Sequence, residues 1–508
     1  IIIIIKKEGE KMDEKIGGDV VSSYTGKIDT TQLVSQFQRI VDNRFAKFIM
    51  KRMTTPKKFE HALGVFAGVD KPNSLGEDLE VKTIEAALKR AMKTFGIDDI
   101  SVVKNALKEP FVRKGVAITL RSVAKYGITK PQVFEAPLLI VWNITKQCNL
   151  KCLHCYANAG PYKHKDELTL AEKLNVVDQF DDAGVTMLSF SGGEPLISPD
   201  FWKVAEYASK KGMYTTIATN GTLLTKENVE KLKNIGIKYV EVSLDAPEPK
   251  THDMFRGVEG AWQRTVDGIK NVVQSGAFDT AIATTATKYN IEEIPQMIDL
   301  AIKLGVKKFI VFNFVPTGRG KDIIAQDLSP KERNDLLNYL YDRWQDKKID
   351  IFSTSPTYSQ IGIERVLAGT GKTYSPTHFA SADYGQTGVG LAEFIGGCGA
   401  GRLYASLEDN GDVGPCVFLP IKVGNIREQS FKEIWENSKV LQELRNRDLY
   451  EENCKSCIFR NPCGGCIAMA YGYFGNYLAP DPGCIYNQKY YDDIVKDFLI
   501  SPEIGGKK

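Results

Sequence analysis

The sequence predicts an α/β protein: a partial (β/α)6 barrel of the TIM type with a helical N-terminal extension and a small cysteine-rich C-terminal domain. Three observations predict this fold class. Short apolar runs and helical stretches alternate between residues 138 and 346, whereas strand signals are scarce before residue 131. Seven of the ten cysteines fall in the last quarter of the chain. With 508 residues and 43% hydrophobic content, the chain can bury more than one core.

We expect five segments along the chain. The helical extension occupies residues 1–134, the barrel 135–350, a linker or insertion rich in Gly, Ser, Thr and Pro 351–397, the cysteine-rich domain 398–490 and a tail 491–508. Apolar residues at three- and four-residue spacing predict helices over 33–53 and 84–95 of the extension.

The end of the extension is basic and amphipathic. A solvated helix face is the favoured interpretation, and a surface for a membrane or an anionic partner is the alternative. The basic residues are Lys104, Lys108, Arg113, Lys114, Arg121 and Lys125.

The barrel segment contains six predicted strands. They span residues 138–145, 187–191, 214–219, 239–244, 280–287 and 308–315. The predicted helices span 168–179, 201–211, 226–235, 262–274, 293–304 and 331–346. Alternating strands and helices form a parallel sheet, whose strands all end at one edge. Functional residues are therefore expected on the loops that leave those strands.

Composition limits the partners and the compartment. The 66 basic and 63 acidic residues give a net charge of +3, so no overall field favours nucleic acid as a partner. No apolar run reaches the roughly 18 residues that a transmembrane helix needs, and Ile1 to Ile5 is too short for a signal-peptide core. We therefore expect a cytoplasmic protein. In a reducing compartment, the clustered cysteines indicate metal ligation and not a disulfide scaffold.

The first cysteine group directly follows the first predicted strand. Its spacing is Cys148-x3-Cys152-x2-Cys155, which places three thiolates on one loop. Three thiolates on a four-iron cluster leave one iron free to bind a substrate or cosubstrate. A zinc knuckle or three unliganded buried cysteines are the alternatives, but zinc sites usually have paired two-residue spacings and a fourth ligand.

These residues resemble the signature of the radical S-adenosylmethionine (SAM) superfamily. The resemblance implies that Cys148, Cys152 and Cys155 hold a catalytic 4Fe-4S cluster whose open iron binds the methionine group of SAM. One-electron reduction then breaks the sulfonium and gives a 5'-deoxyadenosyl radical, which abstracts a hydrogen atom from the substrate. The second signature of the superfamily resembles Ser191 to Pro195, after the second strand.

Further cofactor-binding residues follow from the same resemblance. In the second signature, Gly192 and Gly193 let the backbone approach SAM, and Glu194 accepts from its ammonium group. The resemblance also implies polar contacts from Asn220 at the end of the third strand. At the end of the fourth strand, Ser243 is expected to bind the ribose hydroxyls.

Two residues near the fourth strand, Asp245 and Arg256, have more than one interpretation. Asp245 either contacts the ribose or starts a turn before Ala246. Arg256 either holds a carboxylate or pairs with Asp253. His154 stands where similar proteins have an aromatic residue beside adenine, and we expect packing or backbone contacts from it and no acid–base catalysis.

The C-terminal cysteines resemble the SPASM domain, which holds auxiliary 4Fe-4S clusters. The resemblance implies that Cys454, Cys457, Cys463 and Cys484 hold one cluster. The other would be held by Cys398, Cys416 and Cys466, with an open iron or a non-cysteine ligand. Cys463 and Cys466 are separated by two residues where the family usually has three. A zinc ribbon is the alternative.

The reaction class follows from these signatures, but the substrate does not. We expect a radical SAM oxidoreductase, with peptide or protein modification favoured and a porphyrin of the haem pathway or another cofactor precursor as the alternative. The expected partners are a reductant such as ferredoxin or flavodoxin and a peptide or small-molecule substrate. A non-catalytic metal-binding scaffold or electron carrier is the alternative of another class.

Overall fold

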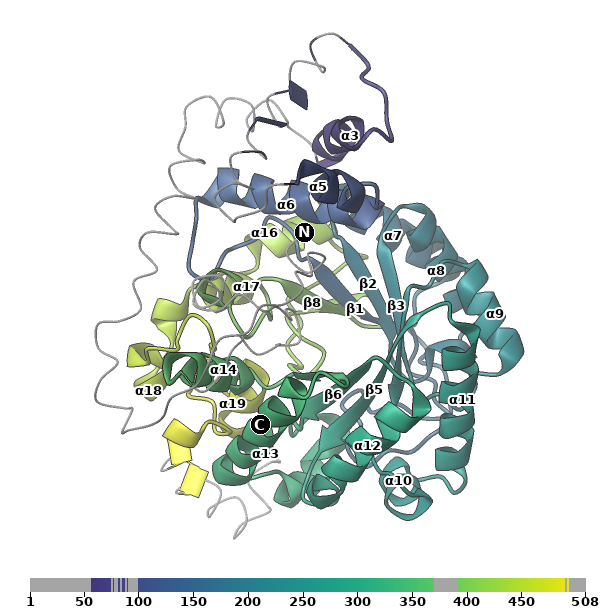
Figure 1. Ribbon diagram of the computed structural model, residues 1–508, viewed down its shortest axis with the longest axis vertical. Coiled ribbons are helices and arrows are strands. Elements are labelled where there is room, and N and C mark those ends of the chain that lie inside the picture. The colour runs from purple at the N-terminus through teal and green to yellow at the C-terminus, as the bar shows by residue number, and fades with distance from the viewer. Residues whose placement is uncertain are drawn as a thin grey trace.

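The computed structural model describes residues 56–74, single positions between 76 and 89, 99–369, 392–488 and 491–492. The helix expected over 33–53 lies outside these residues, and the one expected over 84–95 lies almost wholly outside them. Figure 1 shows one large sheet with helices around its outer side, the N-terminal helices at one end and the C-terminal region beside the first strands.

The sheet has ten strands in the order β10-β9-β8-β1-β2-β3-β4-β5-β6-β7. Strands β1 to β7 pair in parallel with their neighbours, as the sequence predicts for successive strand–helix units. The six predicted strands are confirmed as β1 (Leu139–Asn143), β2 (Met187–Ser191), β3 (Tyr214–Thr219), β4 (Tyr239–Ser243), β5 (Asp279–Ala286) and β6 (Lys308–Asn313).

The predicted barrel helices are confirmed as α7 (Leu170–Ala183), α8 (Pro199–Lys210), α9 (Lys226–Asn234), α11 (Ala261–Ser275), α12 (Ile294–Leu304) and α13 (Pro330–Gln345). Local signals explain their ends. Thr169 and Glu172 form a capping box at the start of α7, and Ser329 and Glu332 form one at the start of α13. Gly184 and Gly305 end α7 and α12 in the left-handed conformation, where glycine has no steric penalty.

The expected linker is partly wrong. Residues of this segment form α14 (Thr357–Leu367), and the preceding β7 (Asp350–Ser353) pairs in parallel with β6. Strand β7 is short, and its pattern lacks the apolar run that identifies the other strands. The sheet is also longer at its other end, because β8 (Tyr404–Leu407) of the C-terminal region pairs in parallel with β1.

The rest of the C-terminal region is built from short elements. Strands β9 (Asp412–Gly414) and β10 (Gly424–Asn425) continue the sheet in antiparallel pairs. The helices are α16 (Phe431–Asn437), α17 (Lys439–Arg445), α18 (Glu452–Ser456) and α19 (Ile467–Phe474).

The described N-terminal region is helical, as expected, with α3 (Pro56–Ala67), α5 (Ile100–Ala106) and α6 (Pro110–Tyr126). The expectation of a solvated basic face holds for Lys108, which is exposed, but not for two residues of α6 that form ion pairs with neighbouring elements. Lys114 is 5% exposed and pairs with Asp181 of α7 at 2.6 Å. Lys125 pairs with Glu436 of α16 at 2.7 Å. The basic side of α6 thus docks this helix on the barrel and on the C-terminal region.

The largest core lies between the sheet and its outer helices. In β2 and β4, Leu188, Phe190, Val240 and Val242 are fully buried in it, while the alternate residues stay partly exposed. Side chains of a strand alternate between its two faces, so the partly exposed residues face the inside of the barrel. The inner face of the sheet is therefore covered less completely than its outer face.

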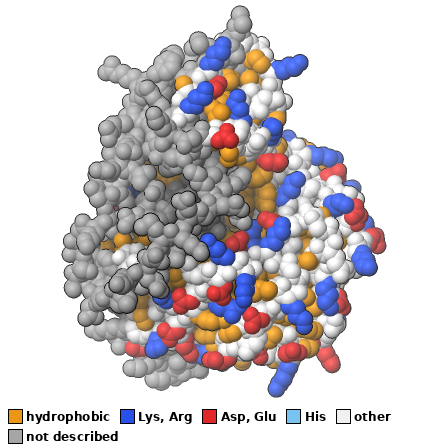
Figure 2. Space-filling view, in the orientation of Figure 1, with side chains coloured by type: hydrophobic (Ala, Val, Ile, Leu, Met, Phe, Trp, Pro, Cys, Tyr) orange, Lys and Arg blue, Asp and Glu red, His pale blue; other side chains and the backbone are white. Residues whose placement is uncertain are grey.

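On the face that Figure 2 shows, Lys and Arg side chains are interspersed with Asp and Glu side chains over the barrel helices. This pattern agrees with the small net charge of the chain. Within the described ranges, no helix has the length and apolarity needed to cross a membrane.

Candidate active site

The loop after β1 carries the first three cysteines and is held from several sides. Cys148 N–H donates to Gly160 O at 2.6 Å, which closes the loop on itself. Leu153 N–H donates to Phe255 O in the segment after β4, at 2.9 Å. After β6, the Arg319 guanidinium donates to Cys152 O at 3.0 Å. The loop is therefore fixed by backbone contacts independent of any ligand.

The three cysteines pack into one small cluster of side chains with Leu150 and Ala261. Burial raises the pKa of the Cys148 thiol to about 12, and burial also raises that of Cys152. Without a metal these thiols are therefore protonated at neutral pH. Iron is the kind of group that compensates the charge of three clustered thiolates, so the donor set fits a cluster.

Gly192 and Gly193 pack against the backbone that leads into this loop. Gly192 has φ +131°, and a Cβ on Gly193 would lie 2.1 Å from Gln147 O. Gly193 N–H donates to Thr145 O at 2.7 Å. A side chain at Gly193 would push the two segments apart, so this glycine is required for their close approach.

Glu194 lies at the centre of three loops. It is fully buried and accepts from Leu196 N–H at 3.2 Å, Thr219 Oγ1 at 2.7 Å and Asn220 N–H at 2.8 Å. Burial raises the pKa of Glu194 to about 7, although the three donors oppose the rise. The carboxylate is thus fixed in position beside the cysteine loop.

Asn220 joins the ends of β3 and the cysteine loop. Its Nδ2 donates to Asn149 Oδ1 at 2.8 Å and lies 4.0 Å from Cys148 Sγ. Ser243 ends β4, and no described side chain is hydrogen-bonded to its hydroxyl. Both positions suit contacts to a cosubstrate at the carboxyl ends of the strands.

Asp245 and Arg256 form a buried ion pair, with Nε to Oδ2 at 2.6 Å. The second oxygen of Asp245 accepts from Thr285 N–H at 3.0 Å. Although burial opposes it, the Arg256 guanidinium holds the pKa of Asp245 below its usual range. Asp245 is thus engaged within the protein, which favours an anchoring role. The alternative pairing of Arg256 with Asp253 is wrong, because Asp253 accepts from the N–H groups of Gly260 and Trp262.

His154 stacks on Phe255, with ring centroids 4.1 Å apart and planes tilted by 21°. Burial lowers the pKa of His154 to about 3, so the ring is neutral at physiological pH. The packing role that the sequence predicts agrees with this geometry.

Two residues at this edge lie outside the sequence motifs. Tyr156 donates to Asn143 Oδ1 at 2.9 Å and lies 3.1 Å from Ser191 Oγ. Arg319 also donates to Ala159 O at 2.7 Å. The position of Tyr156 directly after Cys155 is the one sequence signal that points to it.

Glu241 lies on the inner face of the sheet. It lies on β4 between Tyr239 and Ser243, which face the same side, and it pairs in register with the small residues Ala218 and Ala281. No described residue forms a hydrogen bond or an ion pair with its carboxyl group. Burial raises the pKa of Glu241 to about 7. The sequence gives no signal for this residue.

Burial and nearby charges raise the pKa of several C-terminal cysteines. Burial and then Cys398 raise the pKa of Cys416 to about 12, and burial, Asp481 and then Cys398 raise that of Cys466. Burial and Cys484 raise the pKa of Cys463, and burial, Asp481 and then Cys454 raise that of Cys484. The assignment of these cysteines to two clusters stays a prediction.

N–H groups point at several of these sulfurs. Phe459 N–H lies 3.4 Å from Cys457 Sγ, Gly465 N–H lies 3.4 Å from Cys463 Sγ, and Asn487 Nδ2 lies 3.8 Å from Cys454 Sγ. Such donors stabilise thiolates that hold iron.

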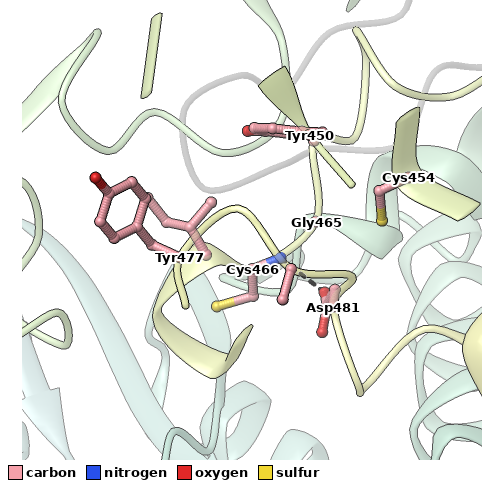
Figure 3. Close-up of a pocket in the computed structure, with 9 residues that line it drawn as sticks. Tyr450, Cys454, Gly465, Cys466, Tyr477 and Asp481 are labelled. Atoms are coloured by element: carbon pink, nitrogen blue, oxygen red, sulfur yellow. Dashed lines mark hydrogen bonds between the residues drawn. The ribbon is translucent and has the colours of Figure 1, made fainter. Parts of the chain in front are cut away.

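Asp481 lies near cysteines of both predicted sets, and no sequence pattern points to it. It is 3% exposed, and its Oδ2 accepts from Cys466 N–H at 2.7 Å. Figure 3 shows this bond in a small pocket that Cys454 also lines.

Among the residues that the structure describes, no three His, Cys, Asp or Glu side chains are arranged to hold one metal ion.

Comparison with known proteins agrees with this site. Residues 142–301 match the radical SAM superfamily, and residues 398–458 match the SPASM iron–sulfur cluster-binding domain. The AdoMet-dependent heme synthase of Methanosarcina barkeri is 38% identical over 353 residues, which cover 69% of this chain and 97% of that protein. The mycofactocin maturase MftC of Mycobacterium tuberculosis is 30% identical over 357 residues, which cover 69% of this chain and 83% of that protein. SuiB of Streptococcus suis, solved with S-adenosylmethionine, has a TM-score of 0.58 and 18% identity, covering 84% of this chain and 92% of that one.

Proposed function

We propose that this chain, which belongs to the radical SAM superfamily and carries a C-terminal SPASM domain, abstracts a hydrogen atom from a porphyrin. It is a radical SAM enzyme with a 4Fe-4S cluster, SAM and auxiliary clusters. When bound, a reduced cluster would supply the electron that converts SAM to methionine and the 5'-deoxyadenosyl radical. The substrate is the part of the activity that we propose here.

The residues of this chain have distinct roles in the proposed reaction. Cys148, Cys152 and Cys155 would hold the catalytic cluster on the preformed loop after β1. Glu194, fixed by three donors, would accept from the ammonium group of SAM. Ser243, whose hydroxyl has no described partner, would bind the ribose. The substrate would bind next to these groups, on the inner face of the sheet where residues of β2 and β4 are partly exposed.

One observation carries the porphyrin proposal over the peptide substrate that the sequence favours. The haem synthase is 38% identical to this chain, and the matched region covers 97% of the haem synthase. The peptide maturase is 30% identical, and the matched region covers 83% of it. A second observation agrees: within the described residues before β1, the structure contains helices and no strand. The winged-helix peptide-binding module of some peptide-modifying relatives needs strands.

The test uses anaerobically reconstituted protein with SAM and dithionite. Fe-coproporphyrin III, a porphyrin with propionate side chains, is expected to raise 5'-deoxyadenosine formation above the substrate-free background and to change in mass. The Cys152→Ala variant should lose both effects and about four irons per chain. If the wild type forms 5'-deoxyadenosine at the background rate with the porphyrin unchanged, the porphyrin proposal fails while radical chemistry stands. Coupling to a peptide instead would support the alternative substrate.

A further inference from the structure

Four arginines are buried in the described part of the chain, and they fall into two classes. Arg256 and Arg333 each pair with a carboxylate, Asp245 at 2.6 Å and Asp327 at 2.7 Å. Arg402 is 1% exposed and Arg447 is 5% exposed, yet no described carboxylate forms an ion pair with either. A buried cation without a counter-charge is costly, so this exception needs an explanation.

Both unpaired guanidiniums converge on one backbone atom. Arg402 Nη2 donates to Cys398 O at 3.3 Å, and Arg447 Nη2 donates to the same oxygen at 3.0 Å. Their other donors are satisfied by carbonyls: Arg402 bonds to Gln132 O and Ile395 O, and Arg447 bonds to Arg460 O and Asn461 O. The hydrogen bonds are thus nearly complete, but the charges are not neutralised.

Two glycines leave room for the guanidiniums of Arg402 and Arg447. Gly464 has φ +76°, and a Cβ there would lie 2.5 Å from Arg447 Cζ. A Cβ on Gly396 would lie 2.8 Å from Arg402 Nη2. Cys398 N–H in turn donates to Cys463 O at 2.9 Å, so the pair lies where the two cysteine groups meet.

We infer that Arg402 and Arg447 supply the counter-charge of the auxiliary cluster that Cys398 helps to hold, and that they raise its reduction potential. The inference rests on the proposed assignment of Cys398, Cys416 and Cys466 to that cluster. A thiolate-ligated cluster is an anion, and each added electron increases its negative charge. Two guanidiniums in a poorly solvated interior therefore stabilise the reduced state more than the oxidised one. They are positioning residues, since they act through Cys398 and its surroundings.

The experiment is a redox titration with dithionite, followed by electron paramagnetic resonance, on full-length protein reconstituted with iron and sulfide. In Arg447→Gln, the midpoint potential of one auxiliary cluster is expected to become more negative, with iron content and the other clusters unchanged. Arg402→Lys keeps the charge and should stay near the wild-type midpoint. Arg445→Gln is the matched control, because Arg445 bonds to Gly401 O and Trp435 O and to no cysteine.

An unchanged midpoint in Arg447→Gln at full iron content overturns the inference, and so does an equal shift in Arg445→Gln. Arg402→Gln should also make the midpoint potential more negative. If this variant does not fold or does not retain iron, the midpoints of Arg447→Gln and Arg402→Lys still test the inference. Cys398→Ala tests the underlying assignment separately, since it should remove iron from that auxiliary cluster alone. The titration needs no substrate, so its result is independent of the proposed porphyrin activity.

Discussion

Arg256 donates from Nη1 to the sulfur of Cys152 at 3.8 Å, so the last residue of α10 (Pro249–Arg256) lies directly against the cysteine loop. The same guanidinium is held by Asp245 at 2.6 Å. The ion pair thereby connects the end of β4 to the middle cysteine of the proposed catalytic cluster.

Asp245→Asn is expected to destabilise the apo protein by about 3–5 kcal/mol, because it leaves a buried guanidinium without its counter-charge. Chemical denaturation monitored by circular dichroism measures this loss. The double variant with Arg256→Met should lose less than the sum of the two single variants, since neither charge is then left alone. Additive losses would contradict the coupling.

Glu194→Gln is expected to weaken SAM binding about 10- to 100-fold, because an amide loses the charge-assisted bond to the ammonium group. Anaerobic equilibrium dialysis against labelled SAM measures the affinity. Glu206→Gln, at an exposed position of α8, is the control and should bind as the wild type does. If Glu194→Gln and Glu206→Gln bind SAM with equal affinity, Glu194 does not contact SAM.

Glu241→Gln tests the isolated carboxyl group in the barrel. Its folded-state pKa, about 7, lies above the ordinary value of 4.5, so the folded protein binds this proton more tightly than the unfolded chain does. The associated stability is present below about pH 4.5 and is lost as the pH rises through 7. The apo variant should therefore melt at a higher temperature than the wild type at pH 8, with a smaller difference at pH 5. A difference that does not depend on pH would contradict the shift.

Lys114→Met tests the docking of the N-terminal helices. Lys114 contacts Asp181 at 2.6 Å and Glu60 at 3.2 Å, and its loss leaves two carboxylates poorly compensated. We expect a loss of about 3 kcal/mol, the lower end of the usual range because Lys57 still contacts Asp181 at 3.2 Å. Hydrogen exchange should increase in α3 and α6. The control Lys125→Met removes a more exposed pair and should cost under about 1 kcal/mol.

Local patterns predicted most of the barrel because each strand carries its own apolar run. Strand β7 was missed because its four residues have no such run. Strand β8 was missed because its pairing with β1 depends on a distant segment that no local pattern reports.

The residues of the site also fall into those that a local sequence pattern reveals and those that only the fold reveals. The cysteine spacing and the Gly193-Glu194 signature are local and were visible in the sequence. The partner of Arg256 was not visible in the sequence. Asp253 is closer to Arg256 along the chain, and only the fold brings Asp245 into contact with Arg256. Arg402 and Arg447 carry no spacing signal at all, and their importance emerges from burial without a carboxylate.

The pairing of β8 with β1 affects how the protein is made. The side-chain bond from Asn143 to Glu408, beside this pairing, joins residues 265 positions apart. During synthesis, β1 therefore emerges from the ribosome long before the strand that covers its edge. Contacts of such high sequence separation form slowly, and an unpaired strand edge is prone to aggregation. The nascent barrel is thus expected to need protection by a chaperone until its last quarter has been translated.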